Sequence, residues 1–511
     1  MRNRYLCWVV LLLAACQGKE ETSGEVPEEP GGYEVEIVID AAAAAPGESS
    51  LTLFSGRLAA GIHPYGRFLT ERALYELADG FSVTVTEEER RQTFTVGRDV
   101  LKARHLVVRS GASLQAAVES AEEGFDDVYV GVGTFAGPFV MREGVDVTGS
   151  WNEDFTETAD YDPLVSTEGL TTILDGGGSG QTLVQPEPFT RETVWRNLRI
   201  VGGLVADADI HGAGACIRGG GVLEGCEVSG NINTGAGNCG GGIYGDTGSV
   251  VRHCSITRNG GIRGGGIFTK GVLAFSVVEK NTATDNGRGG GVSVFGGNTP
   301  SDRAILYNNI IRDNTGIEGG GIHVERYATV YDCLVTGNSA SKNVGGIQTN
   351  GSYGCNIINC TVVGNTDTST SAYAAGICCS EHGVLMNNVV FGNTAAGRED
   401  AEAVQIIVNN RYLFFFNNAY PEGRLEQKVS PWKAERHDAA SDVLLAGLSG
   451  VLDDAFMPVA GSVLLDKGIE TVAVSGHEDG TVPDWTASDL AGRPRKSGSA
   501  LDLGCFEYQA L

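Results

Sequence analysis

One short pattern recurs seven times between residues 214 and 393. Each repeat contains a glycine-rich step into an apolar residue, as in "GGGI" at Ile243. Later in the repeat, a β-branched residue stands three positions before an asparagine, as in "ITRN" at Asn259. Successive glycine landmarks, counted from Ile217, lie 26, 24, 25, 30, 25 and 30 residues apart. A fixed period of this size is typical of a solenoid, in which each repeat forms one coil.

The segments within each period are short and rich in β-branched residues. "CSITRN", "CLVTGN" and "CTVVGN" have the composition of strands that end at a turn residue. The long amphipathic runs of helical solenoids do not occur. Three short strands joined by turns use about 25 residues, and stacked coils repeat at roughly 4.8 Å. The sequence therefore predicts an all-β fold, a right-handed parallel β-helix.

The repeat also predicts which residues stack from coil to coil. The asparagines are expected at a corner, where their amides can hydrogen-bond along the axis and where Asn tolerates left-handed backbone. The position five before each Asn shares one face with the β-branched residue, and that face should be the interior. Its small residues and cysteines are expected to fill a narrow core, with the thiols reduced. This column is Cys226, Cys254, Ser276, Asn309, Cys333, Cys360 and Asn388. A structural ladder explains these columns better than a binding site does.

Both ends of the chain carry recognisable segments. Residues 1–15 read as a signal peptide, with a basic start and a short apolar run. The ending "LAAC" at Leu13 to Cys16 resembles the lipobox of bacterial lipoproteins. That resemblance implies lipidation of Cys16 and anchoring in the outer membrane, facing the cell surface; an uncleaved anchor is the alternative. Residues 16–32 are acidic and rich in Pro and Gly, which favours a flexible tether.

The intervening chain divides into three further parts. Residues 33–108 predict a small, sandwich-like β module, although "TERALYELADG" could form a short helix instead. The β-helix is expected over 109–425, opened by a capping helix in "ASLQAAVESA". Its opening strands resemble those of extracellular carbohydrate-active β-helices with the pectin-lyase-like fold. Residues 426–511 are expected to cap the far end.

The last part of the chain supports a second resemblance. The segment "DLAGRPRKSGSALDLGCFEY" is similar to the C-terminal region of bacterial surface proteins that combine right-handed β-helix repeats with a choice-of-anchor region. The matching positions are Asp489, Gly492, Pro494, Arg495, Asp502, Gly504 and Glu507. This resemblance implies a fold and a surface location, and it implies no reaction.

The net charge limits the classes of molecule that this protein can bind. The chain has 37 Lys and Arg against 64 Asp and Glu, a net charge of −27. Such a surface repels nucleic acid and other polyanions. It would suit calcium as a cofactor, although acidity is also ordinary in secreted proteins. No cysteine and histidine spacing of a zinc site occurs, and no metal site is predicted.

Two outward columns follow each glycine landmark and form a candidate ligand-binding ribbon. The first column is Arg218, Tyr244, Phe268, Ser293, His323, Gln348 and Cys378, and the second includes Asp246, Lys270, Phe295, Glu325 and Asn350. Aromatic faces beside hydrogen-bonding groups suit sugars. The candidate ligand-binding residues are therefore Tyr244, Phe268, Glu325, Gln348 and Asn350. The alternative is an ordinary solvated strand face.

Catalysis on the same ribbon would need a specific set of groups. A hydrolase needs two carboxylates about 5–9.5 Å apart, whereas Asp246 and Glu325 are expected three coils, or roughly 14 Å, apart. A lyase needs a base and a group that neutralises a uronate carboxylate. Lys270 beside Asp246, with His323 and Arg326 two coils further on, is the candidate set. A surface ion pair would explain Lys270 and Asp246 equally well.

These observations favour a lipid-anchored cell-surface protein whose β-helix is a binding or adhesion scaffold. The expected partner is an extracellular polysaccharide or a glycan of a host or cell surface. A polysaccharide lyase or glycoside hydrolase on the same scaffold is the alternative, and a purely structural surface protein is the third possibility. Fold alone does not decide among them.

Overall fold

The structure is a computed structural model that describes residues 32–165, 169–350, 354–369, 375–380, 382–396, 404–409, 413–427, 437, 439–472, 480–481 and 488–509. The signal segment, Cys16 and all of the tether except Gly32 lie outside these residues. The chain forms two compact units, residues 1–106 and 107–511. No helix among the described residues is long and apolar enough to cross a membrane.

The N-terminal unit is built from short strands. Its elements are β1 (Tyr33–Ile39), β2 (Leu51–Leu58), β3 (Gly61–Pro64), β4 (Arg67–Leu69), β5 (Ala73–Leu77), β6 (Ser82–Val85), β7 (Arg91–Val96) and the 3₁₀ turn η1 (Arg98–Val100), followed by β8 (Leu101–Val108). Strands β2, β1 and β7 form one sheet, and β3 and β6 form a second. The helix considered for "TERALYELADG" is wrong, because Ala73–Leu77 is strand β5 with four of its five side chains buried.

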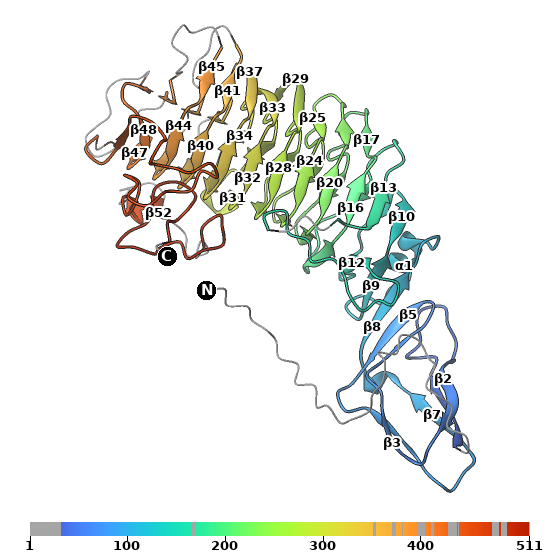
Figure 1. Cartoon of the computed structure of the whole chain (residues 1–511). Helices are drawn as coiled ribbons and strands as arrows, with labels where there is room; N and C mark the ends of the chain where they lie inside the picture. The colour runs from blue at the N-terminus through green and yellow to red at the C-terminus, as the bar shows by residue number, and fades with distance from the viewer. Residues whose placement is uncertain are drawn as a thin grey trace. The chain divides into compact units, whose positions relative to one another are not determined.

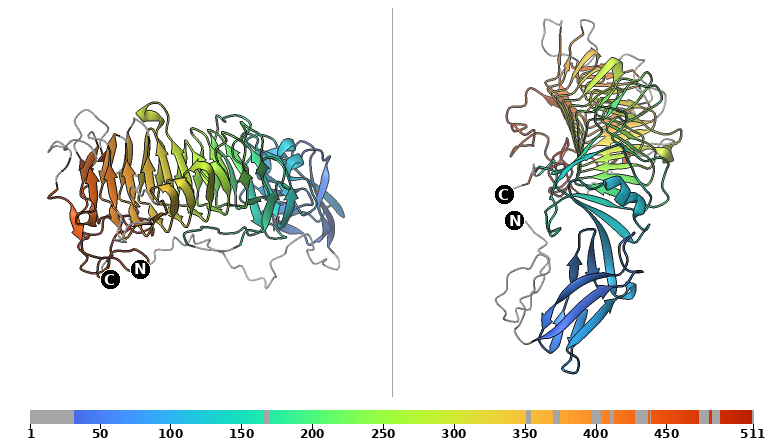
Figure 2. Two further views of the ribbon diagram at one scale, coloured as in Figure 1. Left: turned by 90° about the horizontal axis from the view of Figure 1, so that it is seen from above. Right: turned by 90° about the vertical axis from the view of Figure 1, so that its right-hand side faces the viewer.

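The larger unit is a right-handed parallel β-helix, and Figure 1 and Figure 2 show its coils stacked in chain order. It begins with helix α1 (Leu114–Ser120), whose first turn is capped by the Ser113 hydroxyl, and Leu114 and Val118 are buried. Four sheets run along the axis, instead of the three strands per coil predicted. We number them in the order in which each coil passes through them.

Sheet 1 contains β9 (Asp126–Gly131), β12 (Val147–Trp151), β15 (Thr193–Arg196), β19 (Gly221–Glu224), β23 (Val250–Arg252), β27 (Val272–Ala274), β31 (Ala304–Tyr307), β35 (Ala328–Tyr331), β39 (Cys355–Ile358), β43 (Gly383–Met386) and β47 (Phe414–Phe416). Sheet 2 contains β10 (Gly133–Ala136), β13 (Thr172–Asp175), β16 (Arg199–Val201), β20 (Glu227–Ser229), β24 (Ser255–Thr257), β28 (Val277–Glu279), β32 (Ile310–Arg312), β36 (Leu334–Thr336), β40 (Thr361–Val363), β44 (Val389–Phe391), β48 (Ala419–Pro421) and β50 (Val443–Leu445).

Sheet 3 contains β17 (Leu204–Val205), β21 (Ile232–Asn233), β25 (Gly260–Arg263), β29 (Thr282–Arg288), β33 (Thr315–Glu318), β37 (Ser339–Asn343), β41 (Thr366–Asp367) and β45 (Thr394–Ala395). Sheet 4 contains β11 (Phe139–Val140), β14 (Leu183–Val184), β18 (Ala215–Ile217), β22 (Ile243–Gly245), β26 (Ile267–Thr269), β30 (Val292–Phe295), β34 (Ile322–Glu325), β38 (Ile347–Thr349), β42 (Ile377–Cys379), β46 (Ile406–Val408) and β49 (Leu425–Gln427). Outside these sheets lie the 3₁₀ turn η2 (Pro300–Asp302) and the strand pair β51 (Thr471–Val472) and β52 (Gly480–Thr481).

The predicted asparagine ladder is confirmed at the corner between sheets 2 and 3. Asn281 donates both its backbone N–H and its Nδ2 to the Oδ1 of Asn314, at 3.0 Å each. The same pair of bonds joins Asn314 to Asn338 in the next coil. The left-handed backbone lies one position earlier than predicted, as at Lys280 and Asp313. The chain turns before the Asn, which leaves its side chain free to point inward and reach the next coil.

The predicted interior column is also confirmed. All seven residues of the column that begins at Cys226 are fully buried, and the cysteines among them are free thiols. Hydrogen bonds continue along it where residues are polar: the backbone N–H of Cys254 donates to Ser276, and that of Ser276 donates to Asn309. Small side chains and β-branched neighbours therefore fill the narrow interior.

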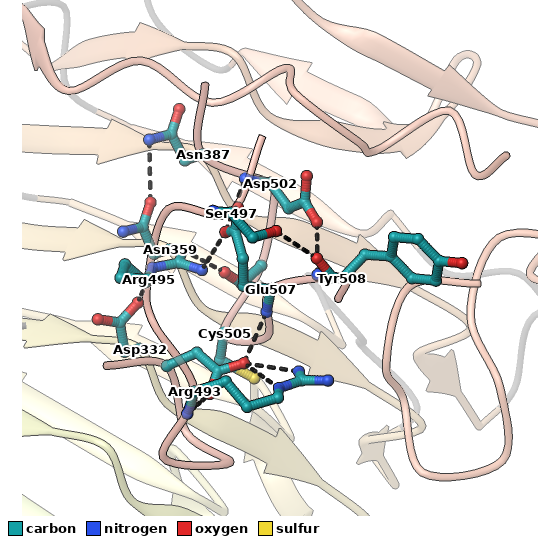
Figure 3. A network of polar contacts seen from close by, with 12 residues as sticks. Asp332, Asn359, Asn387, Arg493, Arg495, Ser497, Asp502, Cys505, Glu507 and Tyr508 are labelled. Carbon is teal, nitrogen blue, oxygen red and sulfur yellow. Dashed lines mark hydrogen bonds and ion pairs between the residues drawn. The ribbon is translucent and has the colours of Figure 1, made fainter. Parts of the chain in front are cut away.

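The C-terminal region adds strand β50 to the far end of sheet 2, and its later residues cover the side of the β-helix. Leu490 and Phe506 pack with Leu334 and Val363 on the outer face of sheet 2. This face carries apolar residues over several coils, so it needs a cover along its length. Figure 3 shows the polar contacts that hold the segment. At their centre, Arg495 lies between two buried carboxylates, 3.1 Å from Asp332 and 3.3 Å from Glu507.

Candidate functional site

The predicted ribbon lies on the outer face of sheet 4, but most of it is covered. Tyr244 and Phe268 are paired in register on β22 and β26, and their rings stack with centroids 5.6 Å apart. They are only 6% and 4% exposed. Cys216 and Cys239 complete their cluster, and Phe295 packs at its edge. The expectation of an open, solvated ribbon is therefore wrong at these positions.

The cover comes from the chain between the asparagine corner and the glycine landmark. From this stretch, the His211 ring stacks on Tyr244 with centroids 4.8 Å apart, and Cys239 packs in the cluster with Tyr244 and Phe268. The first coil is also shifted from its predicted register, because Ala215, not Ile217, pairs with Ile243. Cys216 thus occupies the place predicted for Arg218. The shift arises because "GACI" places its landmark two residues beyond the strand pairing that the later coils share.

Lys270 and Asp246 form an ion pair, with Nζ 3.1 Å from Oδ1. Burial opposes the charge on Lys270, but its contacts with Tyr244 and Asp246 outweigh burial and raise its pKa. Burial would likewise raise the pKa of Asp246, but the Thr247 backbone N–H and Lys270 lower it. Arg218 approaches the same carboxylate at 3.6 Å. A lysine held in its charged form is a poor general base, which weakens the lyase alternative.

His323 is buried beneath the surface of the ribbon. It is fully shielded from solvent, and neither ring nitrogen has a hydrogen-bond partner among the described residues. Burial, together with the charges of Arg288 and Arg263, lowers its pKa to about 3. Its Nδ1 lies 3.7 Å from Glu325, a carboxylate that Arg288 contacts at 2.6 Å. A neutral imidazole without access to solvent cannot meet a polymer substrate.

The remaining ribbon residues do not join a single site. Arg326 stacks over the ring of Phe295 at 4.7 Å and also contacts Asn298. Gln348 pairs in register with His323, and Asn350 donates its backbone N–H to Val324. The strand order β22, β26, β30, β34 places Asp246 and Glu325 three coils apart, as predicted. That separation exceeds what a two-carboxylate hydrolase uses.

A different part of the β-helix contains a cavity of about 470 Å³. It opens beside the first coils of sheet 1, where the segment after β12 returns along the sheet. Aromatic, charged and amide side chains all reach it. Its lining residues are Tyr129, Thr148, Trp151, Thr158, Ala159, Asp160, Tyr161, Asp162, Arg196, Asn197, Glu224, Gly225 and His253. A hollow with aromatic walls and a few converging polar groups is the usual form of a small-ligand site.

The aromatic wall comes from the first two strands of sheet 1, where Tyr129 pairs with Thr148 and the register shifts before Trp151. Tyr129 lies on β9 and Trp151 ends β12, two strands that pair in parallel. Their rings stack with centroids 4.2 Å apart and planes 19° apart. Tyr161 comes from the returning segment, and burial raises its pKa to about 12, so its hydroxyl stays protonated at neutral pH. Tyrosine and tryptophan thus present both apolar surface and hydrogen-bond donors to the cavity.

The charged groups of the cavity are mostly paired. His253 Nδ1 lies 3.1 Å from Asp162 Oδ2. Burial raises the pKa of Asp162, but the bonds from His253 and the Leu164 backbone outweigh it and lower the pKa overall. Glu224 accepts two bonds from Arg252, at 2.8 and 2.5 Å. The side chains at the cavity floor are therefore fixed before any ligand arrives.

Two donors at the cavity have no acceptor. Trp151 Nε1 and Arg196 Nε are shielded from solvent and lack a hydrogen-bond partner among the described residues. The nearest carboxylate of Arg196 is Asp146, 3.9 Å from its Nη2, which is beyond hydrogen-bond length. Unpaired buried donors are costly and uncommon in proteins. Both residues line the cavity, but neither nitrogen has surface open to solvent, so a ligand oxygen would reach them only after neighbouring side chains shift.

The repeat pattern did not predict this cavity. Its residues are spread from Tyr129 to His253, and most precede the regular repeats. The signal available was one aromatic residue in each of two opening strands, Tyr129 within "DDVYVGVG" and Trp151 at the end of "VDVTGSW". Among the described residues, no group of three or more His, Cys, Asp or Glu side chains could hold a metal ion.

Comparisons with known proteins found a matching family model and similar solved structures. A family model described as "Right handed beta helix region" matches residues 196–345, less than half of the chain. The structure of pectate lyase Pel9A is similar, with 14% identity, a TM-score of 0.39, and coverage of 80% of this chain and 97% of that chain. The tailspike protein gp49 from Acinetobacter baumannii bacteriophage Fri1, titled a capsular polysaccharide depolymerase, is also similar. It has 11% identity and a TM-score of 0.36, over 77% of this chain and 76% of that chain.

No curated protein matches the sequence. The four parallel sheets, together with the matched repeats, define the chain as a right-handed parallel β-helix protein.

Proposed function

We propose that this protein is a lipid-anchored cell-surface protein that binds glycan in the sheet 1 cavity. The observation that carries the proposal is the aromatic wall of Tyr129 and Trp151 in a cavity that charged and amide side chains also line. Sugars offer apolar C–H faces and many hydroxyl oxygens, which complement these two features. Anchoring through Cys16 rests on the "LAAC" sequence.

Binding without catalysis is favoured over a lyase. The candidate lyase base, Lys270, is paired with Asp246, and His323 is enclosed. The cavity itself contains Asp160, Asp162 and Glu224, but Glu224 is committed to Arg252 and Asp162 to His253. Carboxylates fixed in ion pairs hold a ligand in place more readily than they transfer protons.

The test is a glycan-binding screen of residues 17–511, followed by affinity measurements on two variants. Trp151→Phe keeps an aromatic ring but removes the Nε1 donor, and Trp151→Ala removes both. We expect Trp151→Ala to abolish measurable binding, because it removes the aromatic wall, and Trp151→Phe to weaken binding by no more than about tenfold, because a ring remains.

Phe295→Leu is the matched control, because Phe295 is a half-buried aromatic on the ribbon of sheet 4. It should bind as the unaltered protein does. The thermal midpoint and the circular-dichroism spectrum of each variant separate lost binding from lost folding. Binding that falls with Phe295→Leu but survives Trp151→Ala would transfer the site to the ribbon and overturn the proposal.

A further inference from the structure

A column of aromatic rings continues from the cavity along the corner between sheets 1 and 2. His253 lines the cavity, and its ring stacks on Phe275 with centroids 5.0 Å apart. Phe275 meets Tyr307 edge-on at 5.2 Å, and Tyr307 lies 6.0 Å from Tyr331. Each ring comes from the next coil, so the column is parallel to the axis.

The exposure of this column changes along its length. Phe275 and Tyr307 are half-buried, whereas Tyr331 is fully buried in a cluster with Ile358 and Met386. Ile469 of the C-terminal region packs against that cluster. The open part of the column therefore begins at the cavity and ends at Tyr307, because the neighbouring Asn308 already bonds to Ser488 of the C-terminal region.

The covered part shows what this corner can hold. Asn308 and Asn387, which are corner residues with left-handed backbone, donate their side-chain amides to the backbone carbonyls of Ser488 and Ile469, at 3.4 and 2.8 Å. Asn417 makes an equivalent bond to Lys467, at 2.5 Å. Side chains at this corner therefore already hydrogen-bond to the backbone of another stretch of the same chain, over several coils.

The charges beside the open part disfavour an acidic ligand. Arg252 is paired with Glu224, and His253 with Asp162. Asp160 also lines the cavity, and no ion pair is recorded for it among the described residues. Arg196 has Asp146 as a partner only at 3.9 Å, but the cavity lining places three carboxylates, Asp160, Asp162 and Glu224, against one arginine and one histidine, and this excess of negative charge repels a uronate or a phosphate. A neutral chain meets no such repulsion.

We propose that the cavity is one end of an axial site that takes a neutral, linear glycan of several sugar units. The site runs over sheet 1 from β9 past His253, Phe275 and Tyr307, and the C-terminal region over Tyr331 sets its far end. Seven neighbouring strands from β9 to β31 span about 29 Å at the normal strand spacing. This inference rests on the proposed function, and it specifies the class and length of the ligand.

The test is calorimetric titration of residues 17–511 with neutral β-linked gluco- and manno-oligosaccharides, from disaccharide to octasaccharide. Oligogalacturonides of the same lengths serve as acidic probes. We expect affinity for one neutral series to rise by about tenfold or more between the disaccharide and the longer members, because additional ring contacts form along the column. Acidic probes should bind more weakly at every length.

Variants at the far end of the open column should show where the gain in affinity arises. Phe275→Leu and Tyr307→Leu should lower affinity for the longest oligosaccharide by about three- to tenfold, and leave the disaccharide affinity unchanged. Trp151→Ala should abolish binding of both. Two separate positions guard against one variant that fails to fold.

Three results would overturn the inference. Affinity that does not depend on length, with Trp151 still required, would limit the site to the cavity and leave the proposed function intact. Tighter binding of oligogalacturonides would refute the neutral class. Failure of all these probes to bind would reject the inference and the proposed function together.

Discussion

Replacing Arg495 with methionine should loosen the C-terminal region from the side of the β-helix. Its guanidinium is 4% exposed and lies between the carboxylates of Asp332 and Glu507 (Figure 3). It also donates to the Gly504 carbonyl at 2.7 Å. Methionine fills a similar volume but leaves both carboxylates buried without their common cation. Breaking a buried pair in this way costs about 3–5 kcal/mol.

The size of the effect should depend on pH. Burial raises the pKa of both Asp332 and Glu507 to about 7, even with Arg495 between them. Without the cation, both carboxyls must take up protons to remain buried, and this becomes more costly as pH rises. The loss should therefore be largest at about pH 8 and clearly smaller at about pH 5.5.

Hydrogen exchange of residues 488–509 is the suitable assay, because a solenoid does not unfold as one cooperative unit. The amide of Cys505 donates to Thr361 and reports on this region. Its protection should fall roughly a hundred- to several-thousand-fold at the higher pH, which is the expected loss of free energy expressed as an equilibrium ratio.

Lys496→Met is the matched control for this experiment. It removes the same charge from the next residue, but Lys496 pairs with Glu470 at an exposed position, so its loss should cost less than about 1 kcal/mol. Adding Asp332→Asn and Glu507→Gln to Arg495→Met should restore much of the protection. Equal effects of Arg495→Met and Lys496→Met would refute the reasoning.

Three further predictions concern the C-terminal region and the interior of the coils. In the unaltered protein, the pKa values of Asp332 and Glu507 are raised, so their stabilising contribution is complete below about pH 4 and is lost as pH rises through about 7. Protection of residues 488–509 should therefore fall over that range, and protection that rises instead would contradict this. Asn314→Ala removes the acceptor of two buried Asn281 donors, and at about 1–3 kcal/mol for each lost partner the denaturation midpoint should fall markedly, whereas an unchanged midpoint would show that the ladder is not stabilising. The ten cysteines between Cys216 and Cys505 are free and buried, so a thiol reagent should label them only after denaturation, and rapid labelling of the native protein would contradict the assigned core.

The repeat region was predictable because its physics is local and periodic. Alternation within "CSITRN" sends Cys254 and Ile256 to one side, and the fixed period stacks them on their neighbours. The interior column and the asparagine ladder follow from these two facts alone. The left-handed position before each Asn, such as Lys280, was misplaced by one residue because composition does not show which residue makes the turn.

The predicted exposure of the ribbon was wrong for a reason that the repeat period cannot reveal. Tyr244 and Phe268 do point away from the interior, but His211 and Cys239 from the segments before the glycine landmarks pack on them. The cavity was missed because Tyr161 and Asp162 reach sheet 1 from an irregular segment. The docking of Arg495 on Asp332 joins residues far apart in the chain. Such long-range packing leaves no local sequence pattern.

The most direct test of the account is the retention of residues 17–511 on immobilised neutral polysaccharides, measured beside Trp151→Ala and Phe295→Leu, with the eluate analysed for shortened chains. We predict retention of the unaltered protein and of Phe295→Leu, loss of retention with Trp151→Ala while its circular-dichroism spectrum shows an intact β-helix, and no shortened chains. Retention that persists without Trp151, or oligosaccharide products released by the unaltered protein, would contradict a glycan-binding scaffold with its site in the sheet 1 cavity.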